Sequence, residues 1–160
     1  MVINKFTKVS YDQYQKDGGG SLEEYDNIKL PQRATSGSAG YDIYSPIDFD
    51  LQPNQTILIK TGIRIRLDND KYLAIFPRSG QGFKFKIQLW NTCGIIDSDY
   101  FNSDNEGHIM IKLFNDSPEG KTMTIKAGTA IAQGIINRFY TTINDSPITD
   151  NRNGGFGSTG

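Results

Sequence analysis

The sequence has few of the residues that build disulfide-bonded or zinc-based scaffolds. Its 160 residues include one cysteine, Cys93, and one histidine, His108. A single cysteine cannot close an internal disulfide, and one histidine leaves no cysteine–histidine cluster with the spacing of a zinc site. We therefore interpret Cys93 as a small buried hydrophobic residue and His108, which follows Gly107, as an exposed structural one.

Long apolar runs and an excess of either charge are also missing. No stretch approaches the roughly 20 apolar residues that cross a bilayer, and residues 1–13 lack the apolar region of a signal peptide. Lysine and arginine number 17 against 18 aspartate and glutamate, so no chain-wide basic field favours nucleic acid. We expect a soluble cytoplasmic protein that binds neither membranes nor nucleic acid and captures any anionic ligand locally.

The hydrophobic pattern is that of a single all-β domain, as the length also suggests. Apolar and polar residues alternate at 56–60 and 62–67, which predicts strands with one wet face. Further short runs of strand type lie at 72–76, 83–90, 108–114, 123–125 and 131–140, separated by Gly, Pro, Asn or Asp. Within 83–90, the pattern places Lys84 and Lys86 on one strand face. Many short strands at this spacing indicate a sandwich, jelly roll or barrel.

Both ends of the chain differ from this β pattern. Residues 1–27 are polar and contain Gly18-Gly19-Gly20, and we interpret them as an N-terminal extension that packs on or flanks the domain. Within them, Ser10 followed by Gln13 predicts the cap of a brief helix. Residues 28–143 carry the strands, and 144–160 are rich in Gly, Asn, Asp and Ser, which predicts a flexible C-terminal arm.

Three segments place polar groups where they can bind or activate a ligand. PRSGQG at 77–82 brings a guanidinium, a hydroxyl and glycine amides together, which suits an anion cradle. GIIDSDY at 94–100 follows Asn91 and ends an apolar run in carboxylates, which can accept a proton from water. GGFGSTG at 154–160 sets Phe156 among glycines, downstream of Arg152. Taken singly, each segment is at least as often an ordinary turn or a loose chain end.

Taken in chain order, these segments resemble the five motifs of the trimeric dUTP pyrophosphatase (dUTPase) family, which bacteria and bacteriophages also carry. The matching segments are 39–44 (AGYDIY), 77–80 (PRSG), Asn91 with 94–100, 128–133 (GTAIAQ) and 152–160. The resemblance implies a distorted jelly-roll β-barrel that forms a homotrimer with a swapped C-terminal arm. It also implies hydrolysis of dUTP to dUMP and pyrophosphate by water attack on the α-phosphorus, which limits uracil in DNA and supplies dUMP for dTTP synthesis.

The resemblance further implies a role for each site residue. Asp97 would be the base that activates water, and Tyr100 would lie under the deoxyribose. The substrate-binding residues would be Arg78, Ser79, Gly80, Asn91, Gly94, Ile96, Tyr100, Gln133, Arg152, Phe156, Gly157, Ser158 and Thr159, with Asp42 supporting the site. Mg²⁺ would be held mainly by the triphosphate and water rather than by protein ligands.

Two alternatives stay open from the sequence. One is a nucleotide enzyme related to dCTP deaminase, which shares parts of the second and third motifs. The other is a protein with the dUTPase fold that chiefly binds a regulatory protein partner. Two regions have no counterpart in the family motifs, residues 1–27 and the extra residues 101–106, and a partner protein would bind there.

Overall fold

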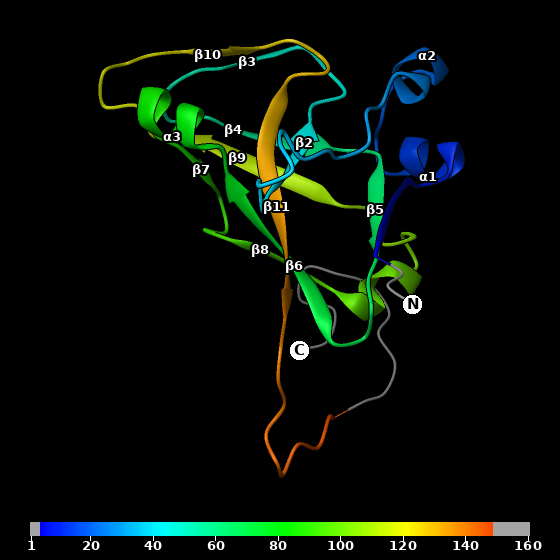
Figure 1. Ribbon diagram of the computed structural model, residues 1–160. Coiled ribbons are helices and arrows are strands. Elements are labelled where there is room, and N and C mark those ends of the chain that lie inside the picture. Colours follow the sequence, from blue (N-terminus) through cyan, green and yellow to red (C-terminus); the bar gives the residue numbers. More distant parts are fainter. Residues whose placement is uncertain (1–3, 149–160) are drawn as a thin grey trace.

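The computed structural model describes residues 4–148 of the chain (Figure 1). Strands dominate this part of the molecule, so the all-β prediction is confirmed. The strands are β1 (Lys5–Lys8), β2 (Tyr41–Tyr44), β3 (Phe49–Leu51), β4 (Thr56–Lys60), β5 (Ile63–Arg66), β6 (Lys71–Pro77), β7 (Ile87–Leu89), β8 (Gly94–Asp97), β9 (Met110–Asn115), β10 (Met123–Ile125) and β11 (Ala130–Arg138). The helices are α1 (Tyr11–Lys16), α2 (Leu22–Asp26), α3 (Ser79–Phe85) and the 3₁₀ helix η1 (Ser98–Asn102).

The strands pair antiparallel in four small sheets. The largest has the order β2-β11-β6-β8, the next β4-β9-β7, and two ribbons pair β1 with β5 and β10 with β3. Figure 1 shows β11 and β6 as a long central pair, with α1 and α2 on one side of the molecule and α3 on the other. In this pair Ala132 lies opposite Pro77 and Arg138 opposite Lys71, so β6 spans the domain from one end to the other.

The core follows from the two-residue alternation of the strands. In β9, Ile111 and Leu113 are buried whereas Lys112 between them is exposed, and in β4 the buried Ile59 faces the same interior. Leu73 of β6 joins them with no exposed surface. Burial of each such side chain stabilises the fold by about 1.5–3 kcal/mol, so the alternation is enough to fix which face of each strand turns inward.

The segment 83–90 was expected to be one strand, and that prediction is wrong. Its first part is the end of α3, and Lys86 then adopts a left-handed conformation with φ of 52° before β7 begins. Lys84 and Lys86 therefore do not share a strand face; the Lys86 ammonium instead lies 2.7 Å from the Asp116 carboxylate. The apolar residues of this segment alternate in the sequence but do not share one environment. Phe83 is exposed on the helix, whereas Ile87 and Leu89 enter the core.

The N-terminal extension is packed into the domain. β1 pairs with β5 over four residues, and Val9 and Tyr14 are each 1% exposed. The predicted helix cap is present, because the Ser10 hydroxyl accepts a hydrogen bond from the Gln13 amide at 3.1 Å. Lys8 adds bonds from its ammonium to the carbonyls that end α2. The segment thus covers one edge of the fold and contributes to its core.

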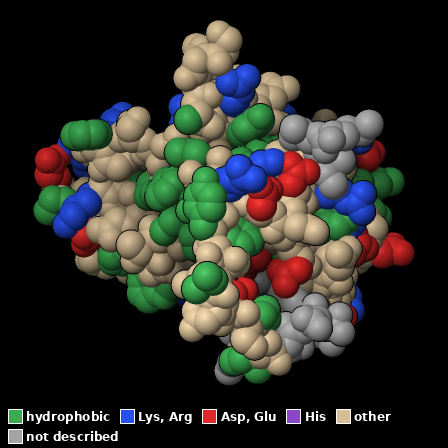
Figure 2. Space-filling model, turned by 60° about the horizontal axis from the view of Figure 1, so that its bottom comes forward, with side chains coloured by type: hydrophobic (Ala, Val, Ile, Leu, Met, Phe, Trp, Pro, Cys, Tyr) green, Lys and Arg blue, Asp and Glu red, His purple; other side chains and the backbone are tan. Residues whose placement is uncertain are grey.

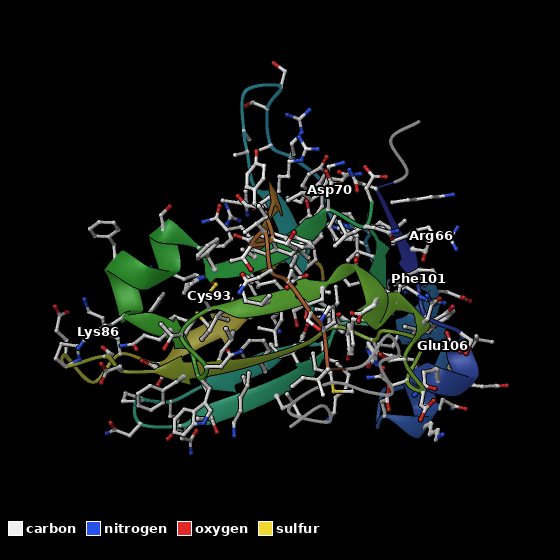
Figure 3. The ribbon with its side chains drawn as sticks, turned by 90° about the horizontal axis from the view of Figure 1, so that it is seen from below. Arg66, Asp70, Lys86, Cys93, Phe101 and Glu106 are labelled. Atoms are coloured by element: carbon white, nitrogen blue, oxygen red, sulfur yellow. The ribbon has the colours of Figure 1, made fainter. Side chains whose placement is uncertain are left out.

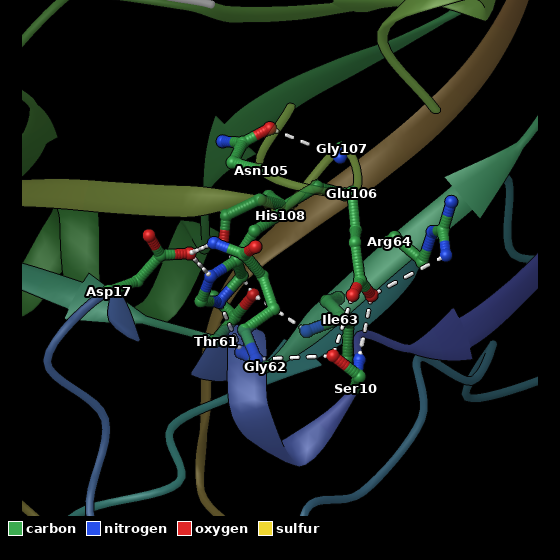
Figure 4. Close-up of polar contacts among 12 residues, drawn as sticks. Ser10, Asp17, Thr61, Gly62, Ile63, Arg64, Asn105, Glu106, Gly107 and His108 are labelled. Carbon is green, nitrogen blue, oxygen red and sulfur yellow. Dashed lines mark hydrogen bonds and ion pairs between the residues drawn. The ribbon is translucent and has the colours of Figure 1, made fainter. Parts of the chain in front are cut away.

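His108 is fully buried, so the expectation of an exposed side chain is wrong. Its Nε2 accepts a hydrogen bond from the Gly62 amide at 2.9 Å, and its Nδ1 lies 2.7 Å from the Asp17 carboxylate (Figure 4). Because Nε2 acts as an acceptor, the ring is neutral and carries its proton on Nδ1. Burial lowers the pKa of His108 below 6.5, and the Asp17 carboxylate opposes that shift.

The buried histidine predicts a stability change at mildly acidic pH. Because the folded-state pKa is lowered, the unfolded chain binds this proton first, and stability falls as pH falls. The contribution of neutral His108 to the free energy of unfolding should be complete above the ordinary pKa of about 6.5. It should be lost as pH falls through the lowered folded-state pKa. Urea unfolding between about pH 7.5 and pH 5 measures the slope of the free energy of unfolding against pH. We assign this slope to His108, the one histidine in this chain. Equal slopes for the natural chain and His108→Gln would contradict the assignment.

Candidate active site

A cavity of about 190 Å³ lies between β8, the hairpin before it and β9. Four of the predicted site residues line it, namely Asn91, Gly94, Ile96 and Tyr100. Its remaining walls are mostly apolar, with Ile75, Leu89, Ile95, Met110 and Ile111 beside the stem of Lys112. The volume is below the roughly 300–1,000 Å³ of pockets for drug-sized ligands, so this cavity suits a single small ring.

The shape of the hairpin explains why small residues stand in it. Gly94 faces β6, where an added Cβ would lie 3.2 Å from the Cβ of Ile75. A side chain at position 94 would therefore crowd Ile75 and require a small shift between β8 and β6. Thr92 has φ of 69° and forms the tight turn, and Cys93 beside it is half-buried rather than fully buried as expected. Figure 3 shows Cys93 on the side of the molecule that faces α3 and away from Glu106.

Asp97 is the last residue of β8 and lies opposite Tyr72 of β6. Its side chain is exposed and borders a shallow cleft together with Tyr72, Ile95 and Phe139. The chain then turns into η1, which returns Tyr100 to the cavity. The carboxylate and the cavity thus lie at neighbouring positions of one strand, where a ligand that fills the cavity can extend toward Asp97.

A second group of predicted residues gathers where β6 ends and α3 begins. The Arg78 Nε lies 3.5 Å from the Asp42 carboxylate, and the Gln133 amide donates to the carbonyl of Pro77 at 3.1 Å. Ser79 and Gly80 form the first turn of α3, and an added Cβ at Gly80 would meet nothing within 4 Å. The segment 77–82 is therefore the start of a helix that leaves room for a ligand at Gly80.

The two groups lie at opposite ends of β6. Asp97 pairs with Tyr72, whereas Ser79 follows Pro77 at the far end of the same strand. Pro77 is five residue steps along the strand from Tyr72, which is about 17 Å at 3.3 Å per residue. Within one chain the carboxylate and the Arg78 group therefore do not face a common ligand. The remaining predicted residues, Arg152, Phe156, Gly157, Ser158 and Thr159, lie outside the described part of the chain.

Sequence reasoning did not single out the residues that support Tyr100. Asn105 Nδ2 donates to the Tyr100 hydroxyl at 2.8 Å, and that hydroxyl donates to the His108 carbonyl at 2.8 Å. Asn105 falls in the segment 101–106, which was interpreted only as an added surface loop. The available signal was the turn-forming run Asn105-Glu106-Gly107, which indicates a tight reversal but not its partner.

The comparisons with known proteins agree with this geometry. A family model described as dUTPase matches residues 26–160. The chain belongs to the dUTPase family. The deoxyuridine 5'-triphosphate nucleotidohydrolase of fowlpox virus is 40% identical over 143 residues, covering 84% of this chain and 92% of the relative. The enzyme of the same name from Lactococcus lactis is 36% identical over 135 residues, with coverage of 83% and 89%.

Solved dUTPase structures share the fold. The dUTPase from Streptococcus mutans superposes with a TM-score of 0.67 at 28% identity, covering 86% of this chain and 97% of that one. A mutant dUTPase from phage phi11 of S. aureus, described with a structural Mg(II) ion, gives a TM-score of 0.65 at 20% identity. It covers 92% of this chain and 97% of the phage protein, and at that identity it bears on the fold alone. The dUTPase jelly roll expected from the five motifs is confirmed.

None of the helices in residues 4–148 combines the length and the apolarity that crossing a bilayer requires. In the same part of the chain, no three His, Cys, Asp or Glu side chains come close enough together to hold a metal ion.

Proposed function

We propose that this dUTPase family member hydrolyses dUTP to dUMP and pyrophosphate by attack of water on the α-phosphorus. The observation that carries the proposal is the cavity lined by Asn91, Gly94, Ile96 and Tyr100, with the Asp97 carboxylate one strand residue beyond it. The cavity has the size of one nucleobase, and the carboxylate beside it can act as a general base. As a nucleotide-pool enzyme it would act in the cytoplasm.

The cavity supplies base selection. Uracil would lie between the walls of Ile96 and Met110, with its polar edge on the backbone of β8 and on the amide of Asn91. A base with a different donor and acceptor pattern would leave buried polar groups unpaired, which can reject it by about 10⁴- to 10⁵-fold. Tyr100 would support the deoxyribose, and a 2′-hydroxyl would collide with its ring.

Asp97 supplies proton abstraction. Its exposed carboxylate borders the cleft next to the cavity and would take a proton from the water that attacks the α-phosphorus. A positioned general base of this kind contributes about 10²- to 10⁴-fold to the rate. The proton moves to Asp97, the new bond forms between the water oxygen and the α-phosphorus, and pyrophosphate leaves.

The phosphates would be bound by a second copy of the chain. Arg78, Ser79, Gly80 and Gln133 form a suitable group but lie about 17 Å along β6 from the Asp97 position of their own chain. We infer a homotrimer in which this group, with Asp42 supporting Arg78, faces Asp97 of a neighbour. The C-terminal residues Arg152, Phe156, Gly157, Ser158 and Thr159 would close the site from a third copy.

The segment after β11 supports assembly. It leaves the domain (Figure 1), and its apolar side chains are exposed: Phe139 by 42%, Tyr140 by 84%, and Ile143 and Ile148 completely. Figure 2 shows hydrophobic side chains gathered across this lower face of the molecule. Monomeric proteins rarely leave such a row in water, so the segment is suited to pack on another copy.

Mg²⁺ fits this site as a substrate-bound ion. The donors near Gly80 and Arg78 are amides, a hydroxyl and a guanidinium, which bind phosphate oxygens rather than a cation. When bound to the triphosphate, the ion would neutralise charge and orient the chain of phosphates. Arg78 and Ser79 would then hold the β- and γ-phosphates against it.

A pyrophosphate-release assay tests the proposed function. We expect efficient release from dUTP with Mg²⁺, little from the four common deoxynucleotides, and at least about tenfold lower kcat/KM for UTP. Omitting Mg²⁺ should lower the rate. Ammonia release from dCTP, or no pyrophosphate from dUTP, would refute the proposal.

A further inference from the structure

The side chain of Tyr100 is held at its hydroxyl as well as by packing. Its Oη donates to the carbonyl of His108 and accepts from Nδ2 of Asn105, each at 2.8 Å. The residue is 4% exposed, and it lines the cavity. The ring therefore cannot tilt away from the cavity without breaking these bonds, and leaving a buried polar group unpaired is costly.

Asn105 is itself fixed by the turn that contains it. Its Oδ1 accepts from the Gly107 amide at 3.1 Å, and its carbonyl accepts from the His108 amide at 3.1 Å. Glu106 and Gly107 both have positive φ, of 58° and 71°. A Cβ at Gly107 would lie 2.7 Å from the carbonyl oxygen of Tyr100, so the turn rests directly on η1. The Asn105 amide thus reaches Tyr100 from a backbone that has little freedom to move.

The N-terminal extension supports the turn from behind (Figure 4). The Glu106 carboxylate accepts from the Ser10 amide at 2.8 Å and from its hydroxyl at 2.6 Å, and lies 3.6 Å from the Arg64 guanidinium. Asp17 binds the ring of His108 at 2.7 Å. The two regions without a counterpart in the family motifs, 1–27 and 101–106, therefore contact each other behind the sugar position.

The same end of the molecule is further fixed by stacking. The Arg64 guanidinium lies 3.6 Å from the centre of the Phe101 ring, and that of Arg66 lies 5.1 Å from it. Figure 3 shows Arg66, Phe101 and Glu106 together at this end. Arg64 also donates to the carbonyl of Phe101 at 2.7 Å, so both the ring and the backbone of Phe101 are attached to β5. The last turn of η1 is therefore held in place on the strand that pairs with β1.

We propose that Asn105 is a positioning residue that sets how strongly the site rejects ribonucleotides, by holding Tyr100 at its hydroxyl. The proposal rests on the proposed function. A 2′-hydroxyl can enter only if the Tyr100 ring gives way, so discrimination depends on how firmly the ring is held. Asn105 holds the Tyr100 ring in place without contacting the nucleotide. The N-terminal extension in turn holds the turn that contains Asn105.

The test compares Asn105→Ala with Asn102→Ala, a matched change at an exposed asparagine of the same segment. We expect Asn105→Ala to lower the dUTP-to-UTP ratio of kcat/KM about fivefold, the value of one net hydrogen bond. KM should account for most of the change, and Asn102→Ala should match the natural chain. A lower melting temperature with an unchanged ratio would mean that Asn105 is merely structural and would overturn the proposal.

Tyr100→Phe gives a second and independent test, because it removes the oxygen that Asn105 holds. In that background Asn105→Ala should leave the ratio unchanged, whereas two independent effects would multiply. A further fivefold loss of the ratio would show that Asn105 does not act through the Tyr100 hydroxyl, and it would refute the inference. Failure of the natural chain to release pyrophosphate from dUTP would instead refute the proposed function. An intact dUTP preference in Asn105→Ala would refute this inference alone.

Discussion

Asp97→Asn should fold and bind dUTP but lose about 10²- to 10⁴-fold in turnover. The change keeps the size of the side chain but removes its negative charge and its capacity to accept a proton. Asp97 is exposed at the end of β8, so the free energy of unfolding should change by no more than about 0.5 kcal/mol. Single-turnover kinetics with excess enzyme separates the chemical step from dUTP binding.

Asp104→Asn is the matched control for this variant. Asp104 is another exposed aspartate, in the loop after η1 and away from the cavity. It should retain natural turnover, so a loss in Asp97→Asn cannot be assigned to the change in net charge. Natural turnover in Asp97→Asn would show that another group accepts the proton, and the assignment of the base would be wrong.

Mixing two inactive variants should restore about a quarter of the activity. In Arg78→Ala the phosphate group is incomplete, and in Asp97→Asn the base is missing, so each variant alone should be nearly inactive. If every site takes Asp97 from one copy and Arg78 from another, random assembly of equal amounts gives both intact residues to about one site in four. Co-expression in equal amounts, followed by purification on one affinity tag that both variants carry, yields the unselected mixture of oligomers for assay.

The mixing result distinguishes two arrangements of the site. The roughly 17 Å of strand between the Asp97 position and Pro77, which precedes the Arg78 group, leads us to expect complementation. If both residues served one site within a single chain, every chain in the mixture would carry one defect, and no site would be complete. Mixed oligomers with no more activity than the separate variants would therefore refute the shared site.

The strands could be predicted from the sequence because one face of each is buried. Ile111 and Leu113 alternate with Lys112, and that local pattern is sufficient to identify β9. The helix α3 could not be predicted in the same way, because Gly80 and Gly82 are poor helix formers and Phe83 continues an apparent strand pattern. Its position depends on contacts with β7, which is the neighbouring element in space.

The predicted site residues differ in how closely the structure groups them, for a similar reason. Asn91, Gly94, Ile96 and Tyr100 lie within ten residues of one another, and the structure brings them to one cavity. Local sequence is enough for such a group. The burial of His108 depends on Asp17, 91 residues earlier, and no periodic pattern links the two positions. In the proposed trimer the residue that faces Arg78 across the site would belong to another copy, and the sequence of one chain indicates that only through resemblance.

The N-terminal contacts also determine when the fold can be completed during synthesis. Ser10 and Asp17 leave the ribosome long before their partners Glu106 and His108, which follow 96 and 91 residues later. At about 5–20 residues per second, this interval is roughly 5–20 s. Until it ends, Val9 and Tyr14 have no complete core to enter, so a nascent chain halted before position 106 should be sensitive to proteases near its start.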